Sequence, residues 1–425
     1  MTSLAIVAAL LVLYATFSRP LNRRGVTAAL ALTLAGFLVG PKVLGWMDLP
    51  LEGPTAERLA EIALALLLFS DAARIDLAAL RKELGWPTRL LLIGLPLTMV
   101  AGGLAGALVF PSLSVASVGL LAIMLASTDA ALGQRVVTDE AVPARVRQAL
   151  NVESGLNDGL AVPFFLVFVD VSLARLHGSA VSAVIDRMVH QIGWGLVAGL
   201  GAAVAGAALV RLAESREWLE GPWRQILTLS TAILAYAAAQ ALGGSGFIAA
   251  FVGGLAFGRV AGACDLPFLR FSEDVGECLA SIVWIGFGAL ALGSVLGAIT
   301  WQIVLYAVLS LTVVRMAPVA LAMVGSRAGW PTVAFLGWFG PRGLASIVFA
   351  LIALDDRVPD SHLLFVTVTV TVALSVIAHG LTSAPLVGVY QRWYAAHTSV
   401  RPDAEEAVPA TAPRYRRQAA TERSL

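Results

Sequence analysis

Five ionisable side chains lie within otherwise apolar stretches of this 425-residue sequence: Asp129, Glu153, Asp158, Arg315 and Arg342. An ionisable group at bilayer depth costs about 2.5–3.5 kcal/mol on insertion scales, so such groups are candidates for function. Three acids and two bases leave one carboxylate without a permanent cationic partner. A surplus acid at this depth indicates a site where a proton or a small cation can bind.

The segment from Glu153 to Asp158 has the spacing of a helix that carries polar groups on neighbouring faces. Ser154 and Asp158 are four residues apart and share one face, while Glu153 and Asn157 share the adjacent face. Glu153 lies about 7.5 Å from Asp158 along the helix axis, towards the cytoplasm. Arg315, in a span of opposite direction, is at a similar depth. We therefore expect Glu153 and Arg315 to form a structural ion pair, which leaves Asp158 as the free acid.

Two other charges lie where helices are expected to break. Asp129 follows Thr128 after a long apolar run, and Arg342 follows Gly340 and Pro341. Proline removes a backbone donor and interrupts the helix. Two interrupted helices in matching places of two halves indicate a transporter with inverted repeats. An acid offsets the positive ends of half-helices and an arginine offsets the negative ends, so we expect Asp129 and Arg342 to lie at such a crossing.

Membrane-spanning helices must position these side chains. Hydrophobic residues make up 58% of the chain and charged residues 13%, with a mean hydropathy of +0.82. Soluble domains carry about 25% charged residues. The composition therefore excludes a cytosolic enzyme, a nucleic-acid-binding protein and a disordered chain. It favours an all-α polytopic membrane protein.

The apolar segments predict the topology. A span needs about 20 apolar residues, and about 13 segments are candidates. The predicted spans are 2–18, 25–45, 56–72, 87–110, 114–137, 148–170, 188–211, 225–242, 245–258, 276–296, 299–325, 331–353 and 361–391. With the N-terminus outside, most of the 29 basic residues fall on the cytoplasmic side. We expect a multi-pass protein of the cell (inner) membrane, with a transmembrane domain over 1–396 and a disordered cytoplasmic tail over 397–425.

The sequence resembles the sodium/proton antiporters of the NhaP type, a branch of the monovalent cation:proton antiporter superfamily, over roughly residues 5–390. The resemblance rests on Thr128-Asp129, the run ESGLNDG (residues 153–159), the glycine-rich segment 243–258, and both arginines. It implies an elevator-type fold with inverted repeats and two broken, crossing helices. It also implies a homodimer, with core and dimerisation parts interleaved along the chain. The sequence departs from the family pattern at one position: Ala130 stands where many members have proline.

The resemblance also implies roles for individual residues. Asp158 matches the acid that alternately binds the cation and the proton. Ser154 and the backbone of Thr128 match groups that help to ligate the ion, and Asn157 matches the neutral residue beside the acid. Glu153 and Arg315 match a structural ion pair. Asp129 and Arg342 match the charges at the crossing of the two broken helices.

These observations predict a secondary antiporter that exchanges a monovalent cation, Na⁺ or K⁺, for H⁺ across a lipid membrane. Burial disfavours the charged form of a carboxylate, so a proton or a transiently bound cation must neutralise Asp158 before the site can cross the barrier. Asn157 carries no proton, so we expect electroneutral exchange. The sequence has no P-loop, and we expect no enzymatic activity and no cofactor. The choice between Na⁺ and K⁺ stays open.

Two other functions stay open at this point. An intramembrane aspartyl hydrolase needs two close acids that share a proton, for which Asp129 and Asp158 are candidates. The Gly-x-Gly-Asp context usual for such enzymes is absent. A sodium-coupled symporter for an organic anion uses a similar broken-helix fold but needs a larger polar pocket. Dequenching of a pH-sensitive dye in everted vesicles on addition of Na⁺ or K⁺ would select antiport.

Overall fold

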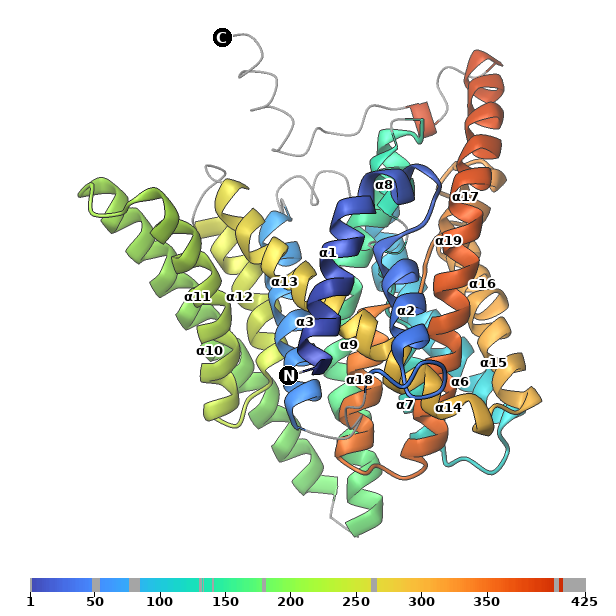
Figure 1. Cartoon of the computed structure of the whole chain (residues 1–425), viewed down its shortest axis with the longest axis horizontal. Helices are drawn as coiled ribbons and strands as arrows, with labels where there is room; N and C mark the ends of the chain where they lie inside the picture. Colours follow the sequence, from blue (N-terminus) through green and yellow to red (C-terminus); the bar gives the residue numbers. More distant parts are fainter. Residues whose placement is uncertain are drawn as a thin grey trace.

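The computed structural model describes residues 2–47, 54–75, 85–129, 132, 134–139, 141–177, 181–260, 266–400 and 405–407. Within these ranges every regular element is a helix (Figure 1). The all-α prediction is confirmed for this part of the chain. Ala130, the position that departs from the family, lies outside the described residues.

The first half of the chain forms helices that differ widely in length. They are α1 (Thr2–Arg23), α2 (Ala28–Val39), α3 (Pro54–Arg74), α5 (Trp86–Arg89), α6 (Leu95–Val109), α7 (Val115–Met124), α8 (Gln134–Thr138), α9 (Ala144–His177) and α10 (Val181–Ser215). A π-helical turn joins α5 to α6, so that Trp86–Val109 is one continuous helical segment.

The second half ends in the longest helix. Its elements are α11 (Gly221–Ala241), α12 (Gly246–Val260), α13 (Leu266–Gly286), α14 (Gly293–Val295), α15 (Trp301–Leu311), α16 (Val313–Ala322), α17 (Trp330–Trp338), α18 (Leu344–Asp355) and α19 (Ser361–Val400). A second π-helical turn joins α13 to α14.

Seven helical segments in the described part of the chain are long and apolar enough to cross a bilayer. They are Thr2–Asn22, Trp86–Val109, Ala144–Ala174, Ile185–Ser215, Leu269–Ala298, Trp301–Ala322 and Ser361–His397. Four shorter apolar helices, α2, α7, α12 and α18, accompany them. The sequence predicts about 13 spans because it also counts short, charged or interrupted helices. The protein is thus a multi-pass helical membrane protein, with seven clear spans among the residues that the structure describes.

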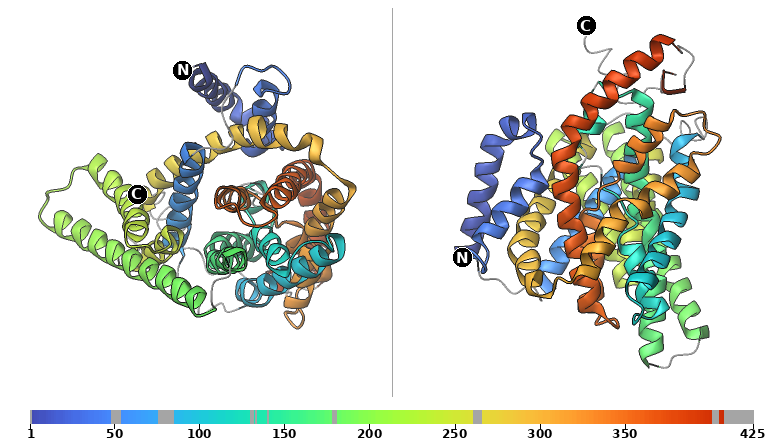
Figure 2. Two further views of the ribbon diagram at one scale, coloured as in Figure 1. Left: turned by 90° about the horizontal axis from the view of Figure 1, so that it is seen from below. Right: turned by 90° about the vertical axis from the view of Figure 1, so that its right-hand side faces the viewer.

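The helices on one side of the molecule are packed closely around α3. This helix lies against α12 and α13, and α10 lies against α11 and α12. In the view along the helices, α10 and α11 extend to one side (Figure 2, left). A side chain at Gly254 of α12 would overlap the Phe69 carbonyl of α3. The predicted glycine-rich ninth span is therefore a place where two helix backbones approach closely, as small residues allow in membranes.

Two helices are interrupted next to one another. Helix α7 ends at Met124 and is followed by non-helical backbone to Asp129, while α17 ends at Trp338 and α18 begins at Leu344. The two irregular segments are joined because the Asp129 amide donates a hydrogen bond to the Pro341 carbonyl at 2.8 Å. Two helix breaks therefore lie side by side, and the first occurs before Ala130 is reached.

Two pieces of the predicted C-terminal tail, residues 397–400 and 405–407, are helical, and the rest of the tail lies outside the described residues. Helix α19 continues past the expected boundary at residue 396 to Val400. A 3₁₀ turn, Glu405–Ala407, follows, and Glu406 is buried. The expectation of disorder rests on polar composition, which cannot reveal hydrogen-bond partners that the fold supplies from other helices.

Candidate functional site

Helix α9 brings four of the predicted site residues to one region of the membrane interior. Glu153, Ser154 and Asn157 are buried, and Asp158 is partly accessible. The helix is 34 residues long, so these residues lie well away from both of its ends. Their spacing distributes them over two adjoining faces that meet α3 and the broken helices.

The first helix break supplies oxygen atoms to this site. The Ser154 hydroxyl donates a hydrogen bond to the Thr128 carbonyl at 2.7 Å. The Asn157 amide nitrogen donates to the Thr128 hydroxyl at 2.5 Å. Because Thr128 follows the end of α7, its carbonyl is not used in a helical ladder and can accept the hydrogen bond from α9.

Several oxygen atoms around Asp158 have no hydrogen-bond donor among the described residues. Oδ1 of Asp158, Oδ1 of Asn157 and the hydroxyl of Ser127 are all buried and form no hydrogen bond of normal geometry with a described residue, although Ser127 lies close enough to interact with Asp158. Buried polar atoms without partners are rare, and each needs an explanation. A set of oxygen atoms that includes one carboxylate suits either a proton on Asp158 or a partly dehydrated alkali cation.

Glu153 and Arg315 form an ion pair at the same depth. The two guanidinium nitrogens donate to the two carboxylate oxygens at 2.5 and 2.8 Å, and both side chains are almost completely buried. Bidentate geometry satisfies both oxygens of the acid. The carboxylate of Glu153 is therefore occupied, whereas Oδ1 of Asp158 is not.

Arg342 lies at the C-terminal end of α7. Its guanidinium donates to the carbonyls of Ala126 at 3.0 Å, Ser127 at 3.2 Å and Ser310 at 3.3 Å, and the side chain is fully buried. Carbonyls past the end of a helix carry partial negative charge. Arg342 thus offsets the negative end of α7 and holds the segment that leads to Thr128.

Asp129 has the complementary position. Its Oδ2 accepts a hydrogen bond at 3.1 Å from the amide of Leu344, the first residue of α18. The amides at a helix N-terminus carry partial positive charge, so a carboxylate there is stabilised. A side chain at Gly343 would overlap Asp129, which explains why glycine precedes α18.

Helix α19 holds the second break from the other side. The Ser375 hydroxyl accepts a hydrogen bond from the Arg342 amide at 2.7 Å. One turn later, Nε2 of His379 lies 2.8 Å from the Trp338 carbonyl, and Nδ1 lies 2.9 Å from the Ser375 carbonyl. Neither residue is among the sequence-predicted site residues, although their i, i+4 spacing in an apolar span is a usable signal.

Asp71 of α3 is a further carboxylate that sequence analysis does not assign to the site. A Cβ atom at Gly155 would lie 3.5 Å from the Asp71 Cβ, so α3 and α9 meet here. Asp71 and Asp129 are both close enough to Asp158 to interact with it electrostatically. Asp71 looks interfacial in the sequence because charged residues follow it, and only the contact with α9 reveals its position.

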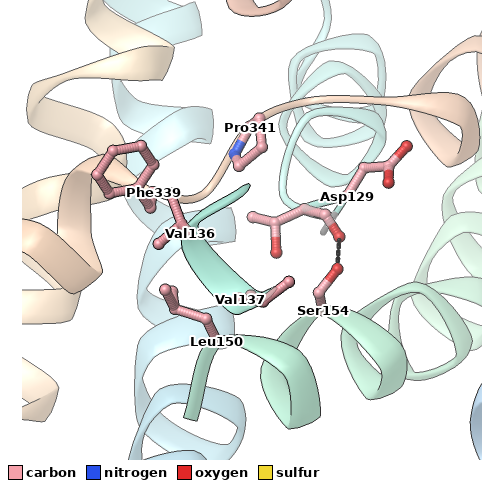
Figure 3. A pocket seen from close by; sticks show the side chains of 8 residues that line it. Asp129, Val136, Val137, Leu150, Ser154, Phe339 and Pro341 are labelled. Carbon is pink, nitrogen blue, oxygen red and sulfur yellow. Dashed lines mark hydrogen bonds between the residues drawn. The ribbon is translucent and has the colours of Figure 1, made fainter. Parts of the chain in front are cut away.

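A small cavity adjoins the site, between α8, α9 and the two breaks (Figure 3). Its lining residues are Thr128, Asp129, Val136, Val137, Leu150, Ser154, Phe339 and Pro341. The polar part is formed by the ion-site residues, and the apolar part lies towards the start of α9. In the described part of the chain, no cluster of three or more His, Cys, Asp or Glu side chains could hold a metal ion.

Comparison with known proteins places the chain in a family. Residues 6–389 match the profile of the family described as "Sodium/hydrogen exchanger, transmembrane". The "K(+)/H(+) antiporter NhaP2" of Shewanella oneidensis is 27% identical over 404 residues, covering 90% of this chain and 66% of the relative. The "Na(+)/H(+) antiporter 2" of Zygosaccharomyces rouxii is 28% identical over 362 residues, covering 78% of this chain and 43% of the relative. The chain therefore spans about two thirds or less of these relatives.

A solved structure has the same fold. The sodium proton antiporter MjNhaP1 from Methanocaldococcus jannaschii superimposes with a TM-score of 0.73, covering 91% of this chain and 97% of that chain, at 20% identity. The family match extends across both broken helices, α9 and α19, and its description is that of a transporter rather than an enzyme. The chain belongs to the family of transmembrane sodium/hydrogen exchangers.

Proposed function

We propose that this protein is a secondary antiporter that exchanges a monovalent cation, Na⁺ or K⁺, for H⁺. The observation that carries the proposal is the buried Oδ1 of Asp158 beside oxygens of Asn157 and Ser127, all three without a hydrogen-bond partner among the described residues. Family membership supports cation and proton as the exchanged ions. The printed names of relatives include both K⁺ and Na⁺ antiporters, so both cations stay within the proposal.

The coupling mechanism follows from competition for one carboxylate. An uncompensated charge is costly to move through a low-dielectric region, so an empty ionised site is held back. A proton on Asp158 removes this charge. A bound cation also removes it, with Asp158, Asn157 and the Thr128 carbonyl as ligands and Ser154 beside them. Either loaded form crosses, and exchange results without ATP.

Electroneutral exchange follows if Asp158 alone titrates in the cycle. Asn157 is neutral, Glu153 is paired with Arg315, and Asp129 is engaged at the start of α18. Each passage of the site then carries one positive charge in either direction. The engagement of Asp129 also disfavours an aspartyl hydrolase, in which two acids must share a proton.

The proposal includes the arrangement in the membrane. The excess of arginine on one side supports a cell-membrane protein with its N-terminus outside and its C-terminus in the cytoplasm. The crossing breaks support inverted repeats and an elevator motion of a core domain, with a transmembrane domain over 1–396. We also propose that the protein forms a homodimer.

The experiment is ion exchange in proteoliposomes with an internal pH-sensitive dye. Addition of Na⁺, K⁺ or Li⁺ in turn should produce proton movement with at least one of them. Asp158→Asn keeps the shape of the side chain but removes its ionisable group, so this variant should be folded and inactive. Near wild-type exchange by purified Asp158→Asn would overturn the assignment of the carboxylate.

A further inference from the structure

The turn Glu405–Ala407 is docked on the protein by its two acidic side chains. Glu406 is 2% exposed, and its Oε1 accepts hydrogen bonds from the Gly329 amide at 2.6 Å and the Thr332 hydroxyl at 2.9 Å. Gly329 immediately precedes α17, which has no capping side chain of its own. Glu406 therefore supplies the carboxylate that the N-terminus of this helix favours.

Glu405 binds a different helix. Its carboxylate forms an ion pair with Nη1 of Arg145 at 2.6 Å, and Arg145 also donates to the Glu405 carbonyl at 3.1 Å. Arg145 is in the first turn of α9, and its guanidinium lies 4.7 Å from the centre of the Trp86 ring. The Arg145 side chain is thus held on two sides, which makes it a fixed receptor for an acid.

The two helices that the turn connects are the ones that flank the cavity beside the ion site. Leu150 and Ser154 of α9 line one side of that cavity, and Phe339 and Pro341 after α17 line another. Arg145 precedes Leu150 by about 7.5 Å of helix. The turn joins the starts of α9 and α17, and the cavity adjoins α9 further along and the C-terminal end of α17.

We propose that Glu405 and Glu406 form an intramolecular strap, which binds a carboxylate-recognition surface made by Arg145, the Gly329 amide and Thr332. The strap holds the starts of α9 and α17 together and slows exchange, and its release raises the exchange rate. This inference rests on the proposed antiport function, because the rate of exchange is the quantity that the strap changes.

The strength of the contact suits a strap that can be released. Oε2 of Glu406 is buried and has no hydrogen-bond partner among the described residues. A buried charge with one unsatisfied oxygen recovers only part of its desolvation cost. The side chains of the Glu405–Arg145 pair are 25–30% exposed, so that pair contributes modestly. Among the described residues, the turn is thus docked by a few directional bonds.

The test compares the full chain with the variants Glu405→Gln, Arg145→Gln and the double variant Glu405→Gln with Glu406→Ala. Two quantities are measured: the initial rate of cation-driven proton movement in proteoliposomes, and hydrogen–deuterium exchange at the amides of the first turn of α17. All three variants should transport several-fold faster, and the double variant should lose amide protection. Glu217→Gln, at an exposed acid in the turn after α10, is the matched control and should change neither quantity.

The outcomes separate the strap from the transport function. If the wild-type chain moves no protons with any cation, the antiport proposal fails, while amide protection still reports whether the strap is docked. If the double variant loses amide protection but transports at the wild-type rate or more slowly, Glu406 is only a structural cap and the strap is refuted. Unchanged protection would also refute it. If the double variant does not fold, Glu405→Gln decides the question through its rate, because its pair is partly exposed.

Discussion

The ion pair between Glu153 and Arg315 gives a quantitative prediction about stability. Removing one partner leaves the other charge buried without compensation, which costs about 3–5 kcal/mol. The two bonds of 2.5 and 2.8 Å and the nearly complete burial place this pair in that class. Glu153→Gln or Arg315→Gln should therefore shift the folding equilibrium by roughly 150- to 4000-fold towards the unfolded state.

The double variant distinguishes a true pair from two independent contributions. With both charges gone, Glu153→Gln combined with Arg315→Gln leaves two neutral amides that can bond to one another. The free energy of unfolding should recover, so that the double variant loses clearly less than the sum of the single losses.

The assay is denaturant unfolding of the purified protein in mixed micelles. Arg74→Gln serves as the control, because Arg74 forms a pair with Glu273 whose side chains are 35% and 23% exposed. Its loss should be about 1 kcal/mol or less. Strictly additive losses at Glu153 and Arg315, or single losses as small as that of Arg74→Gln, would refute the reasoning.

Two further predictions concern the helix crossing and the stoichiometry. A methyl group at Gly340 would overlap Nε of Arg315. Gly340→Ala should therefore destabilise the protein by about 1–3 kcal/mol in the same unfolding assay. Gly103→Ala is the control and should not destabilise the protein, because Gly103 has open space around it. One-for-one exchange should not respond to membrane potential. With Na⁺ as substrate and opposing Na⁺ and H⁺ gradients of equal size, a valinomycin potential of about 100 mV, worth roughly 2.3 kcal/mol per net charge, should drive no net flux. A flux that reverses with the polarity of the potential would reveal a second titrating group.

Much of the site follows from elementary rules applied to the sequence. Opposite charges at equal depth in antiparallel spans predict the contact of Glu153 with Arg315. Pro341 and the polar end of an apolar run at Asp129 predict two breaks, and helix dipoles predict which charge sits at which end. These inferences succeed because a charge at bilayer depth has few acceptable partners, so depth and sign alone select them.

Other features depend on contacts between distant segments and have no local signal. Asp71 becomes part of the site only because α3 meets α9 beside Gly155. Glu406 lies in a polar stretch whose composition indicates disorder, yet the start of α17 supplies its hydrogen bonds. The number of spans is also uncertain from composition, because α7, α17 and α18 are halves of interrupted helices and are shorter than a bilayer-crossing segment.

The central claim is that a proton and a cation compete for the carboxylate of Asp158, and its most direct test is the pH dependence of exchange at different cation concentrations. With equal pH on both sides, the rate should be bell-shaped, because protons exclude the cation at low pH and few protons bind at high pH. Once the cation is near saturation, each tenfold increase in its concentration should move the acid limb down by about one pH unit, since binding shifts proton affinity by the same factor. An acid limb that stays fixed over a tenfold range of cation concentration would contradict competition and indicate a separate proton-binding group.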